Sequence, residues 1–60
     1  MNEYIKIENQ LPRNNQHIFI FYNSEEGVKR VKGFYYKNGT KPTFAAYGSE
    51  IKNVIGWLPR

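Results

Sequence analysis

The sequence has few side chains that could carry out a reaction. It contains no Asp and no Cys, so a nucleophile would have to be Ser24, Ser49, a Thr or a Lys, with His17 as the single imidazole base. No carboxylate stands near His17 in sequence to orient its ring, and a lone His that opens a strand is more often a packing or partly exposed residue. One His without Cys also leaves no cluster for structural zinc. We therefore expect a non-enzymatic protein with no catalytic residue, metal or cofactor.

Two further local patterns argue against catalysis. The adjacent carboxylates Glu25 and Glu26 lie in a predicted turn, where a solvated hairpin tip is the simpler interpretation than an acid/base pair. The glycines do not have the spacing of a phosphate-cradling loop or of a dinucleotide-binding motif. The remaining chemistry is therefore that of binding.

The positive charge is concentrated in the middle of the chain. The net charge is +4, and the stretch from Gly27 to Ser49 contains no acid. Its basic residues are Lys29, Arg30, Lys32, Lys37 and Lys41. Such a patch attracts acidic protein surfaces or phosphates, but it also fits a solvated hairpin face whose lysines discourage edge-to-edge sheet pairing.

The run Lys32-Gly33-Phe34-Tyr35-Tyr36 partly matches the strands of RNA-recognition and cold-shock domains, where a basic residue and Gly precede aromatic residues on which bases stack. Tyr35 occupies a position that those strands keep small, and no paired upstream aromatic strand is recognisable. Packing of the rings in the core is the competing interpretation. Phe34 and Tyr36 would nevertheless point the same way, beside Arg30 and Lys32.

Tyrosines are more numerous than so small a core can hide. With five Tyr in 60 residues, some of Tyr22, Tyr35, Tyr36 and Tyr47 must be partly exposed, and Tyr and Arg are enriched at the energetic centres of interfaces. We predict a contact face for a partner or ligand that consists of Arg30, Lys32, Phe34, Tyr35, Tyr36 and Lys37.

The elements that must position these residues are predicted to be strands. Residues 17–23 are β-branched and aromatic throughout, and a second strand runs over 28–36, with Val31, Gly33 and Tyr35 on one face. Gly33 is a candidate for a bulge. Further strands are predicted over 43–47 and 54–57.

Turn signals separate these strands. Gly27 and Asn38-Gly39 tolerate the left-handed backbone that hairpins need. No segment shows a sustained helical period, although 49–53 could form one helical turn. The chain is thus predicted to be a single all-β domain over 1–60: an antiparallel meander of about four strands, curled into a partly open, SH3-like barrel.

The polar segment before the first long strand needs an anchor. Pro12 cannot donate to a central ladder, so Leu11-Pro12 is expected to dock locally. We expect Tyr4, Leu11 and Trp57 to pack together and to bring the two ends of the chain side by side. The predicted structural anchor consists of Tyr4, Leu11, Pro12, Trp57 and Pro59.

Size and composition suggest self-association. A chain of 60 residues buries only about 60% of the surface that its unfolded form exposes, and without disulfides it depends on aromatic packing or on oligomerisation. We expect a homodimer. No apolar run is long enough to span a bilayer and no secretory signal is recognisable, so a cytoplasmic protein without membrane contact is expected.

The two ends of the chain resemble a family of very short proteins found mostly in phage and prophage genomes, the domain of unknown function numbered five-five-one. Tyr4 stands where the family has Trp, Ile5 and Ile7 keep its apolar alternation, Leu11-Pro12 is identical, and Asn15 replaces a Gly. Further along, Ile18-Phe19-Ile20 matches the family's strand, and Val54, Trp57 and Pro59 match its closing motif. The middle of the chain hardly matches, and Arg60 ends the chain before the family's second Leu-Pro.

The resemblance implies a phage-encoded accessory protein. Our leading hypothesis is a stoichiometric binding protein that attaches to, and inhibits, a host antiviral-defence or regulatory protein. Two alternatives stay open. One is weak binding of single-stranded nucleic acid through Phe34, Tyr36 and the neighbouring cations, and the other is sequestration of a small anionic nucleotide.

Overall fold

The computed structural model describes residues 4–60, which form one antiparallel sheet of six strands. The strands are β1 (Ile5–Lys6), β2 (His17–Ser24), β3 (Gly27–Asn38), β4 (Lys41–Ala46), β5 (Ser49–Glu50) and β6 (Val54–Pro59). Their order across the sheet is β1-β6-β2-β3-β4-β5. The described chain contains no helix, so the all-β prediction is confirmed.

The four predicted strands correspond to β2, β3, β4 and β6, and two short strands were missed. β1 and β5 have two residues each, too few for an alternation to be visible in sequence. The possible helical turn over 49–53 is wrong, because Ser49 and Glu50 pair with Ala46 and Ala45 of β4. The next residue, Ile51, is held at the same edge by its N–H, which donates to Phe44 O at 2.7 Å.

Three tight turns build the meander, and each uses the left-handed backbone. Gly27 (φ 109°) closes β2–β3, and Gly39 (φ 67°) follows β3 as the Asn-Gly signal predicted. Between β4 and β5 the turn is Tyr47-Gly48, with φ of 53° and 76°, the conformation of tight hairpins. Tyr47 therefore lies outside β4 and is 86% exposed.

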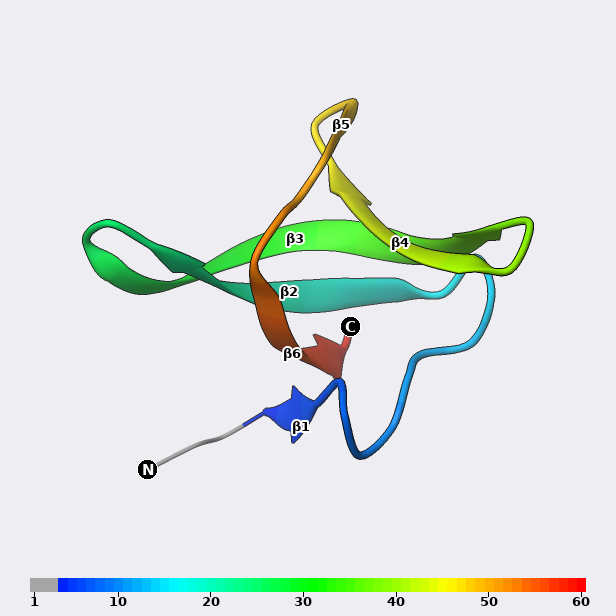
Figure 1. Cartoon of the computed structure of the whole chain (residues 1–60), viewed down its shortest axis with the longest axis horizontal. Coiled ribbons are helices and arrows are strands. Elements are labelled where there is room, and N and C mark those ends of the chain that lie inside the picture. The colour runs from blue at the N-terminus through cyan, green and yellow to red at the C-terminus, as the bar shows by residue number, and fades with distance from the viewer. Residues whose placement is uncertain (1–3) are drawn as a thin grey trace.

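The sheet is strongly curled but does not close into a barrel. In Figure 1 the β5–β6 connection passes across β3, and β6 itself runs across β2, with which it pairs on the side away from β3. The two ends of the sheet, β1 and β5, have no strand pairing between them. The register of β2 on β6 shifts between Phe21 and Tyr22, and this bulge accompanies the bend.

Gly33 serves a close approach rather than the bulge that the sequence suggested. The β2–β3 register runs without a shift from His17↔Phe34 to Ser24↔Gly27. A Cβ on Gly33 would collide with the backbone oxygen of Ala45 and lie 2.7 Å from Ile20 Cδ1. The missing side chain is therefore what allows β4 to fold back over β3.

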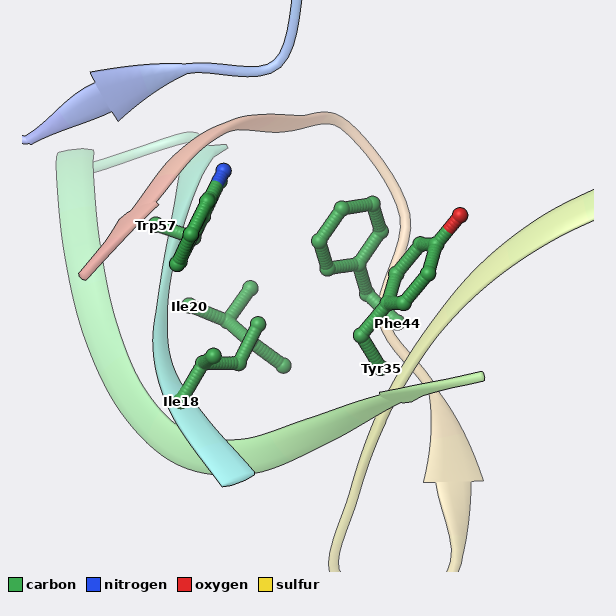
Figure 2. Packing of buried hydrophobic residues seen from close by; sticks show 5 residues of the cluster. All are labelled: Ile18, Ile20, Tyr35, Phe44 and Trp57. Atoms are coloured by element: carbon green, nitrogen blue, oxygen red, sulfur yellow. The ribbon is translucent and has the colours of Figure 1, made fainter. Parts of the chain in front are cut away.

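The core occupies the inner side of the curl. Ile18 and Ile20 from β2, Tyr35 from β3, Phe44 from β4 and Trp57 from β6 form the buried cluster, and Figure 2 shows these side chains facing one another. Tyr35 and Phe44 meet edge to face with centroids 5.0 Å apart. Aromatic packing thus supplies much of the burial that so short a chain can achieve.

The two ends of the chain meet as predicted, but the placing of Tyr4 in a cluster with Trp57 is wrong. Pairing of β1 with β6 sets Ile5 opposite Trp57, and Trp57 Nε1 donates to Gln10 O at 2.9 Å. The Tyr4 ring stacks instead on Phe21, which alternates with the inward Ile20 and so lies on the other side of the sheet from Trp57. Leu11 is 41% exposed, whereas its neighbour Pro12 is buried.

Candidate binding face

The side of the sheet opposite the core carries a row of rings, which we call the outer face. It consists of His17, Phe19 and Phe21 of β2, Arg30, Lys32, Phe34 and Tyr36 of β3, and Tyr4. Cross-strand pairs fix this set, since directly opposite residues of an antiparallel pair share a face. His17 opposes Phe34, Phe19 opposes Lys32, and Phe21 opposes Arg30.

The rings of the outer face contact one another in two groups. Phe34 and Tyr36 stack with centroids 5.7 Å apart and planes inclined by 28°, and His17 lies 6.1 Å from Phe34. At the other end of the outer face, the Tyr4 ring stacks on the Phe21 ring, with centroids 4.8 Å apart. Phe34 is 38% exposed and Tyr36 is half-buried, so part of the first group remains open to a ligand.

Two cations accompany the rings on β3. The Arg30 guanidinium lies 5.1 Å from the centroid of the Phe19 ring, a cation–π arrangement that holds the charge in place above the sheet. Lys32 is exposed on the same face, two residues further along β3 from Arg30 and directly opposite Phe19. Basic and aromatic groups are therefore interleaved on one surface.

The predicted contact face is brought together except for two of its members. Arg30, Lys32, Phe34 and Tyr36 share the outer face. Tyr35 is 0% exposed and belongs to the core, so its inclusion is wrong. Strand alternation puts it on the inner side, and the curl of the sheet then encloses it. Lys37 has the same phase as Tyr35 but is exposed at the end of β3, where its N–H donates to Asn14 Oδ1.

Four residues of the outer face were absent from the predicted contact face: Tyr4, which was assigned to the anchor, and three residues of β2. His17, Phe19 and Phe21 flank the inward Ile18 and Ile20 on β2. The sequence signal was present, since aromatic and aliphatic residues alternate there, but both kinds suit a core. Only the pairing of β2 with β3 reveals which set lies beside Phe34.

A hollow of about 350 Å³ lies beside the two stacked rings. Phe34, Tyr36 and Ala45 line it together with the residues that lead into and form β5, Gly48, Ser49 and Glu50. Phe34 opposes Ala45, and Ala45 opposes Glu50, so the three residues form one row across β3, β4 and β5. In this row the small methyl group of Ala45 lies between the Phe34 ring and the Glu50 side chain.

A second groove, of about 680 Å³, opens at the mouth of the curl on the core side. Its apolar lining includes Ile7, Leu11, Phe44, Ile51 and Val54. Glu8, Lys41 and Lys52 contribute both signs of charge to it, and Glu50 lies at the border between this groove and the hollow. Leu11 is exposed at this groove. The groove could not be predicted from the sequence, because its residues come from three separate segments of the chain, 7–11, 41–44 and 50–54.

The residues considered for catalysis lie apart. Ser24 ends β2 and donates its hydroxyl hydrogen to Gly27 O within the turn, while Ser49 lies in β5, three strands away in the sheet order. Glu25 and Glu26 lie at the β2–β3 tip, where Glu26 pairs with Lys29 at 2.6 Å. No group of three or more potential metal ligands gathers within residues 4–60.

No helix able to cross a bilayer occurs in the described part of the chain. Comparison with family models, with curated proteins and with solved structures finds no match.

Proposed function

We propose that this protein is a non-enzymatic binding module for single-stranded nucleic acid. Its outer face would bind the bases against Phe34 and Tyr36 and the phosphates against Arg30 and Lys32. The observation that carries the proposal is the stacked, partly exposed Phe34–Tyr36 pair with His17 beside it. Stacking of a base on an aromatic ring contributes about 1–3 kcal/mol and tolerates any base. A single strand is the form that offers several such bases in succession.

The pairing of β2 with β3 supports this proposal. The sequence offered no recognisable aromatic strand next to Lys32–Tyr36, yet His17 opposes Phe34 and Phe19 opposes Lys32. Two adjacent strands therefore present rings and cations together. That combination matches the general design of sheets and grooves that bind single strands, in which a basic surface follows the backbone while rings receive the bases.

The test is fluorescence polarisation with a labelled single-stranded DNA of mixed sequence at low salt. Because each neutralised phosphate of a single strand contributes about −0.7 to the slope of log affinity against log salt, the two cations predict a slope near −1.4. Lys32→Gln should reduce its magnitude by about 0.7. Lys52→Gln removes the same charge at the mouth of the curl and should leave the slope nearly unchanged.

Phe34→Leu separates stacking from charge, because it removes the ring but keeps an apolar side chain at a partly exposed position. We expect it to weaken binding by about 1–3 kcal/mol without changing the salt slope. Thermal-shift measurements with free nucleotides distinguish a mononucleotide ligand from a strand. Absence of binding to both at low salt would refute the proposal.

Attachment to a host protein is the second candidate, and the Arg30–Phe19 contact favours it. A guanidinium held over a ring loses less freedom when it forms a bidentate pair with a carboxylate, and Arg with Tyr is typical of interface hot spots. The resemblance to the phage family suggests inhibition of a host defence or regulatory factor. The left-handed backbone of Asn15 (φ 64°), where that family has Gly, is consistent with this resemblance.

A pull-down from nuclease-treated bacterial lysate tests this candidate without bridging nucleic acid. The wild type should retain an acidic protein that the triple variant Arg30→Ala, Lys32→Ala, Tyr36→Ala loses. Recovery of the same protein by the variant would contradict this use of the outer face.

A further inference from the structure

We infer that the hollow beside Phe34 and Tyr36 is a base-reading subsite, in which Glu50 favours cytosine over thymine or uracil. The inference rests on the proposed function and goes beyond it, since stacking on Phe34 and Tyr36 alone distinguishes bases poorly.

The shape of the hollow follows from three adjacent strands. Across the sheet Phe34, Ala45 and Glu50 stand directly opposite one another. Side chains of neighbouring strands in such a row are roughly 5 Å apart. Because Ala45 has only a methyl group, space remains above it between the Phe34 ring and the Glu50 side chain. The volume of about 350 Å³ lies in the range of small-molecule pockets.

The turn between β4 and β5 supplies the far wall. Tyr47 and Gly48 both have left-handed backbone, which reverses the chain within two residues and returns Ser49 and Glu50 to pair with β4. Glu50 is thereby held at a defined register position, although its side chain is exposed. A loop of arbitrary conformation would not keep a carboxylate opposite Ala45.

The charges around the hollow decide the class of ligand. Arg30 and Lys32 stand on the same face of β3 as Phe34. A polyanion satisfies these cations, whereas the carboxylate of Glu50 requires a hydrogen-bond donor from the same ligand. A nucleic acid strand provides both, because its phosphates are negative and some of its bases carry amino groups.

The identity of the base follows from hydrogen-bond chemistry. A carboxylate only accepts hydrogen bonds, and the N4 amino group of cytosine donates at the edge where thymine and uracil present the O4 acceptor. The two pyrimidines stack with rings of the same size, so Glu50 would distinguish them by attraction to N4–H and repulsion from O4. Phe34 and Tyr36 would hold the ring of either base.

The experiment compares oligo-dC and oligo-dT of about ten nucleotides, a length within the site sizes of single-strand binding folds, by fluorescence polarisation at pH 7.5. We expect the wild type to bind oligo-dC about threefold to tenfold more tightly, below the full value of a bidentate base contact because Glu50 is exposed. Glu50→Gln should bring the ratio close to one, since an amide both donates and accepts. Glu25→Gln makes the same change of net charge at the distant hairpin tip and should keep the wild-type ratio.

The outcomes separate the subsite from the general function. Equal affinity of the wild type for both oligonucleotides, or a ratio unchanged in Glu50→Gln, overturns the subsite while binding itself persists. Loss of both affinities in Phe34→Leu, with far-UV circular dichroism unchanged, supports a shared stacking surface. Failure of the wild type to bind either oligonucleotide at low salt overturns the proposed function and the subsite together.

Discussion

Tyr35 buries a hydroxyl that has no hydrogen-bond partner among residues 4–60. Its side chain is 0% exposed, and Figure 2 shows the hydroxyl pointing away from Ile18 and Ile20. A buried polar atom without a partner destabilises the folded state by about 1–3 kcal/mol, whereas the ring itself contributes to the core. The residue therefore combines a stabilising ring with a destabilising polar atom.

We predict that Tyr35→Phe raises the free energy of unfolding by about 1 kcal/mol, because it removes the hydroxyl and keeps the ring. Tyr47→Phe is the matched control: the residue is 86% exposed, so the same change should alter stability by less than about 0.5 kcal/mol. Urea denaturation followed by Trp57 fluorescence measures both. A loss of stability in Tyr35→Phe would show that the hydroxyl does have a partner in solution.

The arrangement of elements depends on two close approaches, one at each side of the sheet. β4 folds back over β3 at Gly33, where a Cβ would meet the backbone of Ala45. β1 lies against β6 at Gly56, where the Tyr4 ring and Ile5 O occupy the space of a Cβ. Both glycines are needed for proximity rather than for a left-handed backbone, since neither has a positive φ.

We predict that Gly33→Ala destabilises the protein by about 1–3 kcal/mol or more, since the backbone of β4 cannot move as easily as a side chain. Gly39→Asn is the control, because that turn glycine has nothing within 4 Å and Asn tolerates its φ of 67°. Chemical denaturation of both variants tests the expectation. Wild-type stability of Gly33→Ala would mean that β4 does not cross β3 closely in solution.

At the scale of the whole molecule, the two strands that end the sheet order are short, but β3 has a longer unpaired edge. β1 and β5 end the strand order and contain two residues each, so either edge offers few backbone groups for pairing with a second copy. From Val28 to Lys32, β3 pairs only with β2, because β4 pairs with β3 from Phe34 onward, so this longer edge is available to the expected homodimer. Dimerisation would also add burial to a chain whose single core rarely supplies more than about 3–5 kcal/mol.

We predict that the denaturation midpoint rises with protein concentration, as it must for a dimer that dissociates on unfolding. A hundredfold increase in concentration should add about 2.7 kcal/mol to the apparent stability. Analytical ultracentrifugation of the same samples supplies the mass independently. A midpoint that does not depend on concentration, with the mass of one chain, would contradict the dimer.

The sequence alone was sufficient for the four longer strands and for two of the tight turns. The β-branched and aromatic run in 17–23 and the alternation in 28–36 reflect local preferences of backbone and side chain, as do Gly27 and Asn38-Gly39 between strands. The phase of β3 was also predictable, since Arg30, Lys32, Phe34 and Tyr36 alternate with Val31, Gly33 and Tyr35. These features need no knowledge of distant contacts.

Only the tertiary structure decided which rings are buried and which are exposed. Aromatic residues occupy both phases of β2 and β3, so composition does not distinguish Tyr35, which the curl encloses, from Phe34, which stays partly open. The hollow forms because a two-residue turn returns Glu50 beside Ala45. The anchor differs from the predicted one because the Tyr4 ring stacks on Phe21, on the opposite side of the sheet from Trp57. Each of these outcomes depends on contacts between strands, and burial is a property of that packing rather than of any single segment.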